Sequence, residues 1–210
     1  MGERGQRRER TVDIPTPTTS VGTTVRLNMD GSVPEDNPFV GSDEGLDEVY
    51  SYGHRNQQGM AIHPETGAIW QNEHGPHGGD ELNLVEAGAN YGWPDVSYGD
   101  TYSDQTPIGG TEAEGVTNPV EYWDPSPALS GMTFYTGDKF PNWQNHLFMG
   151  ALARQKVMRL TLDGQEVSHQ EELLSGELGR IRDVATGPDG YLYLLTDAPE
   201  GGLYRLEPVE

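Results

Sequence analysis

The sequence predicts an all-β protein made of short antiparallel strands joined by tight turns. Glycine and proline together are frequent, with 28 and 15 of the 210 residues, and both favour turns over long helices. Apolar, β-branched and aromatic residues alternate along short runs, as they do in half-buried strands. Asp-Gly pairs at 30–31, 163–164 and 189–190 indicate hairpin turns.

The elements follow one another without a clear internal boundary, so we expect a single domain over 1–210. Its first 20 residues are polar and predict an irregular segment, with sheets from 21 to 210. The stretch 95–130 is rich in Gly, Pro, Thr and acidic residues and predicts a loop. One helical turn is expected near 140–145. The expected strand segments, in order, are 23–31, 48–53, 59–73, 81–88, 131–137, 145–174 and 181–209.

A weak internal repeat favours a particular all-β architecture. Residues 60–71 and 184–195 share a strand, a Pro-acid-Gly turn and a second strand, and 132–152 is a longer version. Residues 25–33 and 158–167 share an outer hairpin with an Asp-Gly turn. Two such hairpins make a four-stranded sheet, and sheets repeated at about 40–60 residues suggest propeller blades. Pattern alone leaves a β-sandwich open.

Composition excludes several classes of protein. The formal net charge of -21 argues against a nucleic-acid or anionic-lipid partner. The sequence contains no run of 18 apolar residues, so it predicts no membrane-spanning helix. The start MGERGQRRER is charged with no apolar run after it, so no signal peptide is expected. Cysteine is absent, which excludes disulfide and thiolate chemistry.

The motif YGHRNQQG at 52–59 gathers many hydrogen-bond donors between two expected strands. A guanidinium such as Arg55 presents a fixed fork that suits carboxylates of a planar, polyanionic ligand. The alternative is a polar turn in which Arg55 pairs with one of the many acidic residues.

The stretch QNEHGPHGGDELN at 71–83 predicts a metal site or a solvated turn. Calcium prefers oxygen ligands, including carbonyls, and the carbonyls of Gly75 and Pro76 could face one ion. Zinc or manganese held by His74, His77 and Asp80 would instead indicate a metal hydrolase, but Gly-Pro between the histidines breaks any helix.

The motif GRIRDV at 179–184 places Arg180 and Arg182 two residues apart on an expected strand. Side chains with this spacing share one face, so the pair predicts a local anion site. The alternative is two surface ion pairs of little energetic weight.

Several long segments, taken in order, resemble the soluble quinoprotein sugar dehydrogenases of the glucose/sorbosone dehydrogenase family, and most closely their aldose sugar dehydrogenase branch. The central segment is SYGHRNQQGMAIHPETGAIWQNEHGPHGGDELNLVEAGANYGWPDVSYG, 51–99. PALSGMTFYTGDKFPNWQNHLFMGAL and GRIRDVATGPDGYLYLLTD resemble later parts of the same proteins. GERGQR and GTTVRLNMDGSVPEDNPFV resemble the part just upstream, so the likeness covers nearly the whole chain.

The resemblance implies a six-bladed β-propeller, of which this chain would form about three to four blades. It implies pyrroloquinoline quinone (PQQ) and calcium as cofactors. The implied reaction oxidises the anomeric carbon of an aldose sugar to a lactone and passes electrons to an external acceptor. By analogy with relatives, the full-length protein is expected in the periplasm or outside the cell.

Site residues follow from the resemblance position by position. Arg55 and Asn56 match cofactor contacts, and His74 stands where some members have a glutamine beside the ion. Arg180 and Arg182 match the arginines that hold the quinone's carboxylates. The carbonyls of Gly75 and Pro76 match the pair that holds the cofactor's calcium. Glu81 and Tyr91 resemble the ligands of a second, structural calcium.

Two departures from the family pattern affect the expected chemistry. Some members use a lysine on the quinone where this chain has Ala153, so the neighbouring Arg154 is the expected substitute. The family's catalytic histidine would lie upstream of Met1, so no catalytic base is expected in this chain, and His54 is the nearest replacement. Weak or no activity is therefore expected, and we expect the chain either to self-associate through open propeller edges or to be only marginally stable. A degenerate propeller that binds calcium or sugar without catalysis is the alternative function.

Overall fold

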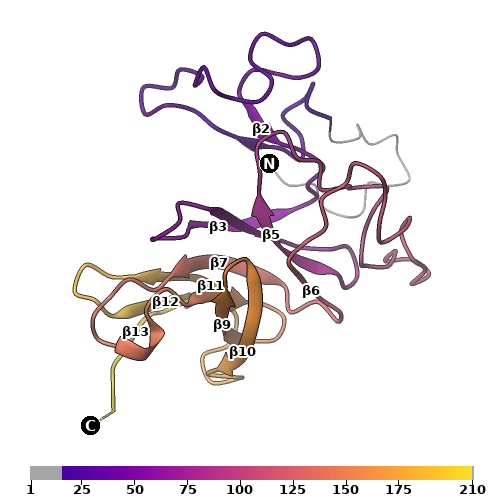
Figure 1. Ribbon diagram of the computed structural model, residues 1–210. Helices are drawn as coiled ribbons and strands as arrows, with labels where there is room; N and C mark the ends of the chain where they lie inside the picture. The colour runs from indigo at the N-terminus through magenta and orange to yellow at the C-terminus, as the bar shows by residue number, and fades with distance from the viewer. Residues whose placement is uncertain (1–15, 210) are drawn as a thin grey trace. The chain divides into compact units, whose positions relative to one another are not determined.

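The computed structural model describes residues 16–209, and its regular structure is almost entirely β (Figure 1). The 310 helix η1 at Pro141–Trp143 confirms the helical turn expected near 140–145. No helix of the described part is long and apolar enough to cross a membrane. The strands are β1 Thr24–Val25, β2 Val49–Ser51, β3 Gln57–Ile62, β4 Ile69–Glu73, β5 Asp80–Val85, β6 Glu121–Trp123, β7 Leu129–Phe134, β8 Leu147–Ala151, β9 Lys156–Asp163, β10 Glu166–Leu173, β11 Ile181–Thr186, β12 Leu192–Thr196 and β13 Leu203–Leu206.

Hydrogen bonding groups these strands into four sheets. Two sheets have four strands, in the orders β3-β4-β5-β6 and β10-β9-β8-β7. A third has the order β11-β12-β13, and β1 and β2 form a pair. Consecutive strands are neighbours throughout, which is the meander topology that hairpin-forming sequences favour.

The chain divides into two compact units. The first combines the residues up to Gln57 with Glu73–Pro125, and the second combines Gln58–Asn72 with the chain from Ser126 onward. The single domain over 1–210 therefore stays a prediction. Most of the expected irregular segment, 1–15, lies outside the described residues.

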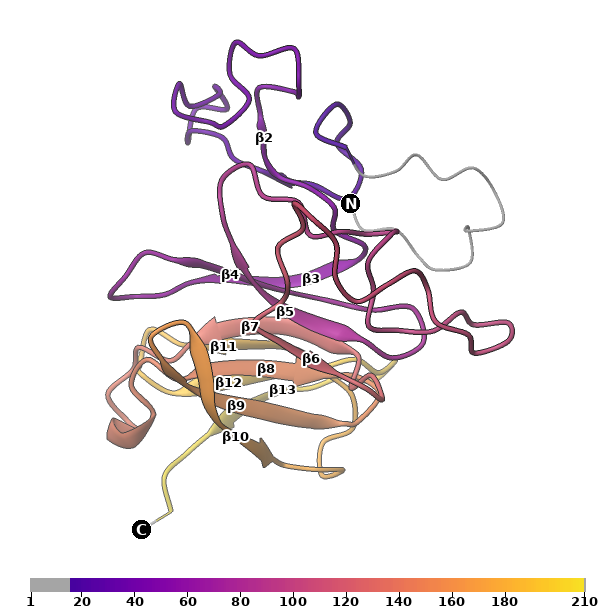
Figure 2. The same cartoon turned by 45° about the vertical axis from the view of Figure 1, so that its right-hand side comes forward.

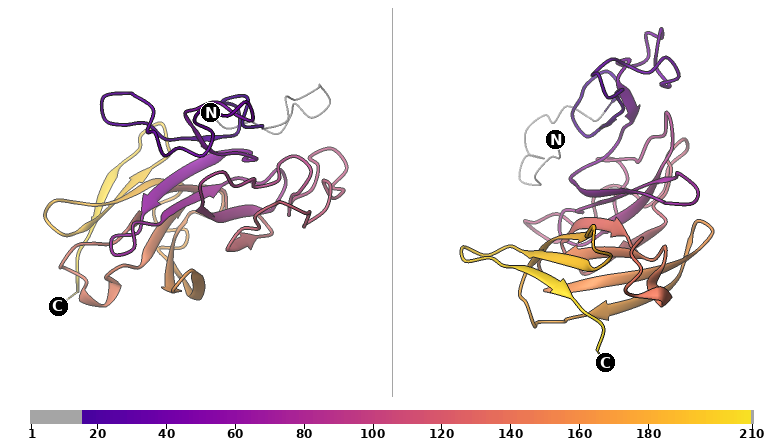
Figure 3. Two further views of the ribbon diagram at one scale, coloured as in Figure 1. Left: turned by 45° about the horizontal axis from the view of Figure 1, so that its top comes forward. Right: turned by 90° about the vertical axis from the view of Figure 1, so that its left-hand side faces the viewer.

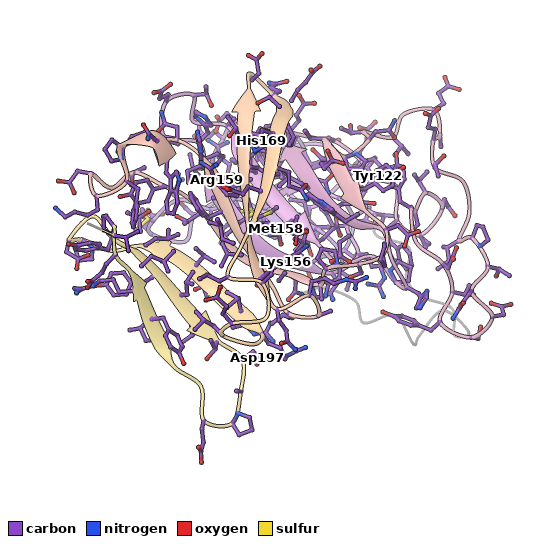
Figure 4. All side chains as sticks on the ribbon, turned by 90° about the horizontal axis from the view of Figure 1, so that it is seen from below. Tyr122, Lys156, Met158, Arg159, His169 and Asp197 are labelled. Carbon is purple, nitrogen blue, oxygen red and sulfur yellow. The ribbon has the colours of Figure 1, made fainter. Side chains whose placement is uncertain are left out.

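The second unit contains a sheet whose central strand is β8, with β7 and β9 beside it (Figure 2). All five residues of β8, LFMGA, are buried, as is typical of a strand covered on both faces. The outer strand β10, EVSHQEEL, is mostly exposed and charged, which protects a sheet edge from pairing with other chains. Arg159 of β9 pairs with Glu171 across the hairpin on which His169 also lies (Figure 4).

The core of the second unit lies between this sheet and the sheet β11-β12-β13. Both views in Figure 3 show the two sheets against each other, and β11 contacts β7 and β8. Burying one such side chain contributes about 1.5–3 kcal/mol relative to leaving it exposed. The fully or nearly fully buried members are Tyr135, Phe148, Val157, Ile181, Val184, Leu192 and Leu194.

The first unit is held by shorter strands and a long connection. Strand β5 pairs with β6 in antiparallel register, with Asp80 opposite Trp123. The connection between them buries Tyr91 and Trp93. The prediction of a continuous loop over 95–130 is therefore wrong at β6, because the three residues EYW are too few to show alternation.

The Asp-Gly turns had different outcomes. Those at 163–164 and 189–190 join β9 to β10 and β11 to β12, as predicted. At 30–31 the turn is present, with Gly31 at φ 85°, but β1 covers only Thr24–Val25, so the predicted hairpin is absent.

Candidate functional site

The candidate site of the first unit begins at the turn that follows β2. Gly53 adopts φ 79°, and a Cβ there would lie 2.2 Å from Asn90 Oδ1. Only glycine tolerates this backbone conformation together with such a close approach. The turn places His54, Arg55 and Asn56 between β2 and β3, in the polar motif singled out from the sequence.

Glu73, the last residue of β4, is the centre of the hydrogen bonding at this turn. Its Oε2 accepts hydrogen bonds from the backbone N–H groups of Arg55 at 2.6 Å and Asn56 at 3.2 Å. Its Oε1 accepts from Asn83 Nδ2 at 3.0 Å and lies 3.0 Å from His54 Nδ1. The side chain is 4% exposed. Sequence reasoning assigned no role to Glu73.

The environment keeps Glu73 ionised. Burial would raise the pKa of its carboxyl group, but His54 and the two backbone donors oppose burial and hold the pKa below its usual value. A buried carboxylate with four partners is the arrangement that makes its charge tolerable.

His54 is held from both sides of its ring. Nε2 lies 2.9 Å from Ser51 Oγ, Nδ1 faces Glu73, and the ring stacks on Tyr91 at 4.5 Å between centroids. The residue is fully buried. Neither ring nitrogen is open to a substrate in this conformation, so the geometry does not favour His54 as a catalytic base.

Arg55 brings the predicted cofactor residues and the predicted metal loop together. Its Nη1 donates to the carbonyls of His74 and Gly75, both at 2.8 Å. Its guanidinium lies over the Trp93 ring, 5.2 Å from the centroid. Burial lowers the pKa of Arg55 from its ordinary value, although Tyr102 and nearby carboxylates counteract this. The guanidinium stays charged because the ordinary value is so high.

The buried Nε of Arg55 and Nε1 of Trp93 have no hydrogen-bond partner in the described structure. Both residues line one small pocket. Buried donors are rarely left unpaired in proteins, so these two fit a small acceptor such as a water molecule or one oxygen atom of a ligand.

The loop after β4 is shaped by Gly75. A Cβ on Gly75 would lie 2.0 Å from the Gly78 carbonyl oxygen and 2.3 Å from that of Gly79, so the loop folds back tightly on itself. The Gly75 carbonyl oxygen accepts from Arg55, and a carbonyl oxygen has two lone pairs in all. His74 Nδ1 lies 3.4 Å from Asn56 Nδ2, so these two predicted cofactor residues are neighbours.

The same pocket is lined by acidic groups. It has room for about one water-sized atom or ion, and Glu73, Glu81 and Tyr91 lie in its wall. Burial, followed by the charges of Glu73 and Asp80, raises the pKa of Glu81 well above its usual value. A cation bound here would favour the ionised form of Glu81, so the group of acidic side chains fits a cation site.

Tyr91 contributes to this pocket in a limited way. Its hydroxyl donates to the Leu84 carbonyl and accepts from the Glu86 backbone N–H, and burial raises the pKa of Tyr91 to about 12. The atom of Tyr91 best suited to a hard cation is therefore the backbone carbonyl oxygen.

The alternative metal site receives no support. Within residues 16–209, no group of three or more His, Asp or Glu side chains is arranged to hold a metal ion. His77 instead pairs with Asp100 through backbone hydrogen bonds. The zinc or manganese hydrolase built on His74, His77 and Asp80 thus has no geometric basis, whereas a site built largely from carbonyl oxygens needs no such group.

In the second unit, Arg180 and Arg182 converge on one carboxylate oxygen. Asp197 Oδ2 accepts from Arg180 Nε at 3.0 Å, Arg180 Nη2 at 2.8 Å and Arg182 Nη2 at 3.0 Å. These bonds, chiefly those from Arg180, lower the pKa of Asp197. The expected shared face is found, with two positive charges against one negative charge. With arginine side chains 46% and 42% exposed, these contacts are also the surface ion pairs of the alternative, and an anion site here stays a prediction.

The other predicted residues are less informative. Arg154 is exposed in the turn between β8 and β9, and its backbone N–H donates to the Pro127 carbonyl. Arg55 belongs to the first unit, whereas Arg154, Arg180 and Arg182 belong to the second. Their convergence on one ligand stays a prediction.

Comparison with known proteins places these features in context. A family model described as glucose/sorbosone dehydrogenase matches residues 1–205. The aldose sugar dehydrogenase YliI of Escherichia coli (strain K12) is 48% identical over 189 residues, which are 89% of this chain and 51% of that protein. The chain spans about half the length of the curated relatives it matches.

Solved structures agree with the predicted fold. A glucose dehydrogenase crystal structure superimposes with a TM-score of 0.88 at 50% identity, covering 92% of this chain and 57% of the other. The PQQ-bound aldose sugar dehydrogenase of Streptomyces coelicolor gives 0.72 at 31% identity, covering 91% and 53%. The expected all-β fold of the glucose dehydrogenase propeller type is confirmed, and the sandwich is excluded.

Proposed function

Because the chain belongs to the glucose/sorbosone dehydrogenase family, we propose that it is part of a quinoprotein that oxidises the anomeric carbon of an aldose to a lactone. PQQ and calcium are the proposed cofactors. The observation that carries the proposal is the buried guanidinium of Arg55, fixed at the carbonyls of His74 and Gly75 beside unpaired donors in a small pocket. When bound, the quinone would supply the hydride acceptor.

The residues of this chain would bind and orient the cofactor. Arg55, Asn56 and His74 offer donors from the first unit. Arg180 and Arg182 offer the forked cations that suit carboxylates, with Asp197 keeping them aligned. Arg154 is the proposed substitute for a lysine on the quinone.

Calcium would bind through oxygen atoms at two places. The carbonyls of Gly75 and Pro76 would hold the ion beside the cofactor. The Glu81 carboxylate and the Tyr91 carbonyl would hold a second, structural ion, which the acidic wall of the pocket favours.

We assign no catalytic base to this chain. His54 is buried, and both of its ring nitrogens face protein groups. General-base catalysis typically contributes about 10²–10⁴-fold, so we propose that the chain alone turns over sugar weakly. We also propose that the electrons pass to an external acceptor. The full-length protein is proposed to be exported from the cytoplasm.

The test is a titration of the chain with PQQ, followed by absorbance, in calcium and then in excess chelator. The proposal predicts saturable uptake that the chelator reverses and added calcium restores. Uptake that ignores calcium, or no uptake, would contradict it. Calcium binding without quinone uptake would support the alternative, a non-catalytic binding module.

A further inference from the structure

A chain of buried hydrogen bonds connects Ser51 to the backbone of Arg55 and Asn56. Ser51 Oγ lies 2.9 Å from His54 Nε2, and His54 Nδ1 lies 3.0 Å from Glu73 Oε1. The other oxygen of Glu73 accepts the amide hydrogens of Arg55 and Asn56. Ser51 and His54 are fully buried, and Glu73 is nearly so.

The order hydroxyl, imidazole, carboxylate is that of a hydrolytic triad, but this one cannot reach a substrate. A nucleophilic serine must be open to the bond it attacks. Ser51 is fully buried, and neither Ser51 nor His54 lines the pocket, whereas Glu73 does. The network therefore acts on the site through Glu73.

The geometry requires a carboxylate at position 73 and a proton on His54 Nδ1. Each oxygen of Glu73 faces two donors, which a glutamine, with one acceptor oxygen, cannot reproduce. Because the carboxylate only accepts, Nδ1 must carry the hydrogen. The ring orientation is then fixed by Ser51 at Nε2 and by stacking on Tyr91.

We propose that His54 and Glu73 are positioning residues of the cofactor site. Glu73 fixes the amide groups of Arg55 and Asn56 by accepting their hydrogen bonds, and His54 fixes the orientation of the Glu73 carboxylate. The locked backbone directs the Arg55 guanidinium to the carbonyls of His74 and Gly75 and the Asn56 amide towards His74. The inference rests on the proposed function for the identity of the ligand.

The test uses two substitutions that separate the two ring nitrogens. His54→Asn places an amide nitrogen near the position of Nδ1 and keeps a donor to Glu73. His54→Gln places its amide near Nε2 and loses that donor. Glu73→Gln removes the carboxylate, and Ser51→Ala gives a milder change if a buried variant fails to fold. His146→Gln, at a ring that contacts Arg159 of the second unit, is the control.

Two readouts are measured on the full chain. Amide hydrogen exchange at Arg55 and Asn56 should accelerate about tenfold or more in Glu73→Gln and His54→Gln, and about threefold or less in His54→Asn. The apparent affinity for PQQ in calcium should fall in the same order. Ser51→Ala should give a smaller acceleration of amide exchange and a smaller loss of PQQ affinity. His146→Gln should change neither the exchange rates nor the affinity.

The outcomes separate the two proposals. If the unsubstituted chain binds no PQQ but the exchange pattern holds, the proposed function fails and the positioning of the amides stands. Unchanged exchange at Arg55 and Asn56 in folded Glu73→Gln or Ser51→Ala would overturn the inference. Equal effects of His54→Asn and His54→Gln would also overturn it, since the Nδ1 donor would then be irrelevant.

Discussion

Glu73 shows how a residue without a predicted role can organise a site. Its partners His54 and Asn83 are 19 and 10 positions away in sequence, so spacing along the chain cannot reveal them. Arg55, by contrast, stood out in its motif because a guanidinium suits carboxylates, although the motif alone left a polar turn open and the cofactor role of Arg55 stays a prediction. Residue types were thus predictable, and their mutual contacts were not.

Acid should weaken the chain partly through Glu73. A carboxyl group with a lowered folded pKa contributes stability that is present above its unfolded pKa, about 4.3, and is lost as pH falls through the folded value. Glu73→Gln should therefore lower the free energy of unfolding most at neutral pH, with a difference that shrinks below about pH 4. Urea unfolding from pH 7 to pH 3 measures this. A pH-independent difference would contradict it.

Glu81 should couple stability to calcium. Its raised pKa means that keeping it charged is unfavourable without a cation. At calcium about 100 times Kd, the unsubstituted chain should gain about 2.7 kcal/mol, or roughly 5–10 °C in Tm. Glu81→Gln should melt higher without calcium and lose most of the calcium response, whereas the exposed control Glu44→Gln should behave like the parent. An undiminished calcium shift in Glu81→Gln would remove it from the proposed ligands.

Strands of the second unit were the most predictable elements. The run 145–174 became β8, β9 and β10 because its apolar stretches are long and its Asp-Gly turn is unambiguous. The short β6 and the absent hairpin at 30–31 show the limit of pattern reading. Three-residue strands depend on pairing with a partner distant in sequence, and that pairing leaves no local signal.

The central strand β8 should dominate the stability of the second unit. Phe148 is fully buried among Tyr135, Trp143 and the β11–β12 core. Phe148→Ala should cost about 3–5 kcal/mol in the free energy of unfolding. Chemical denaturation measures the loss, with the exposed Val209→Ala as a control expected within about 0.5 kcal/mol of the parent. Similar losses for both substitutions would contradict the assigned core.

The whole molecule presents an edge that favours association. Strand β13 ends its sheet, and Leu203 and Tyr204 on it are 69% and 41% exposed. An exposed apolar edge strand is a template for pairing with another chain, in line with the proposed self-association. Sedimentation should show concentration-dependent oligomers that Leu203→Lys weakens. A monomer at all concentrations would contradict this.

The central claim is that the buried guanidinium of Arg55 binds a carboxylated cofactor. The most direct measurement compares PQQ affinity in calcium for Arg55→Lys, Arg182→Gln and the exposed control Arg205→Gln. A hydrogen bond to a charged group contributes about 1.5–3 kcal/mol, so the first two should each bind about 10–100-fold more weakly and the control should match the parent. Full affinity in folded Arg55→Lys would contradict the central claim, and full affinity in folded Arg182→Gln would remove Arg182 from the proposed cofactor contacts.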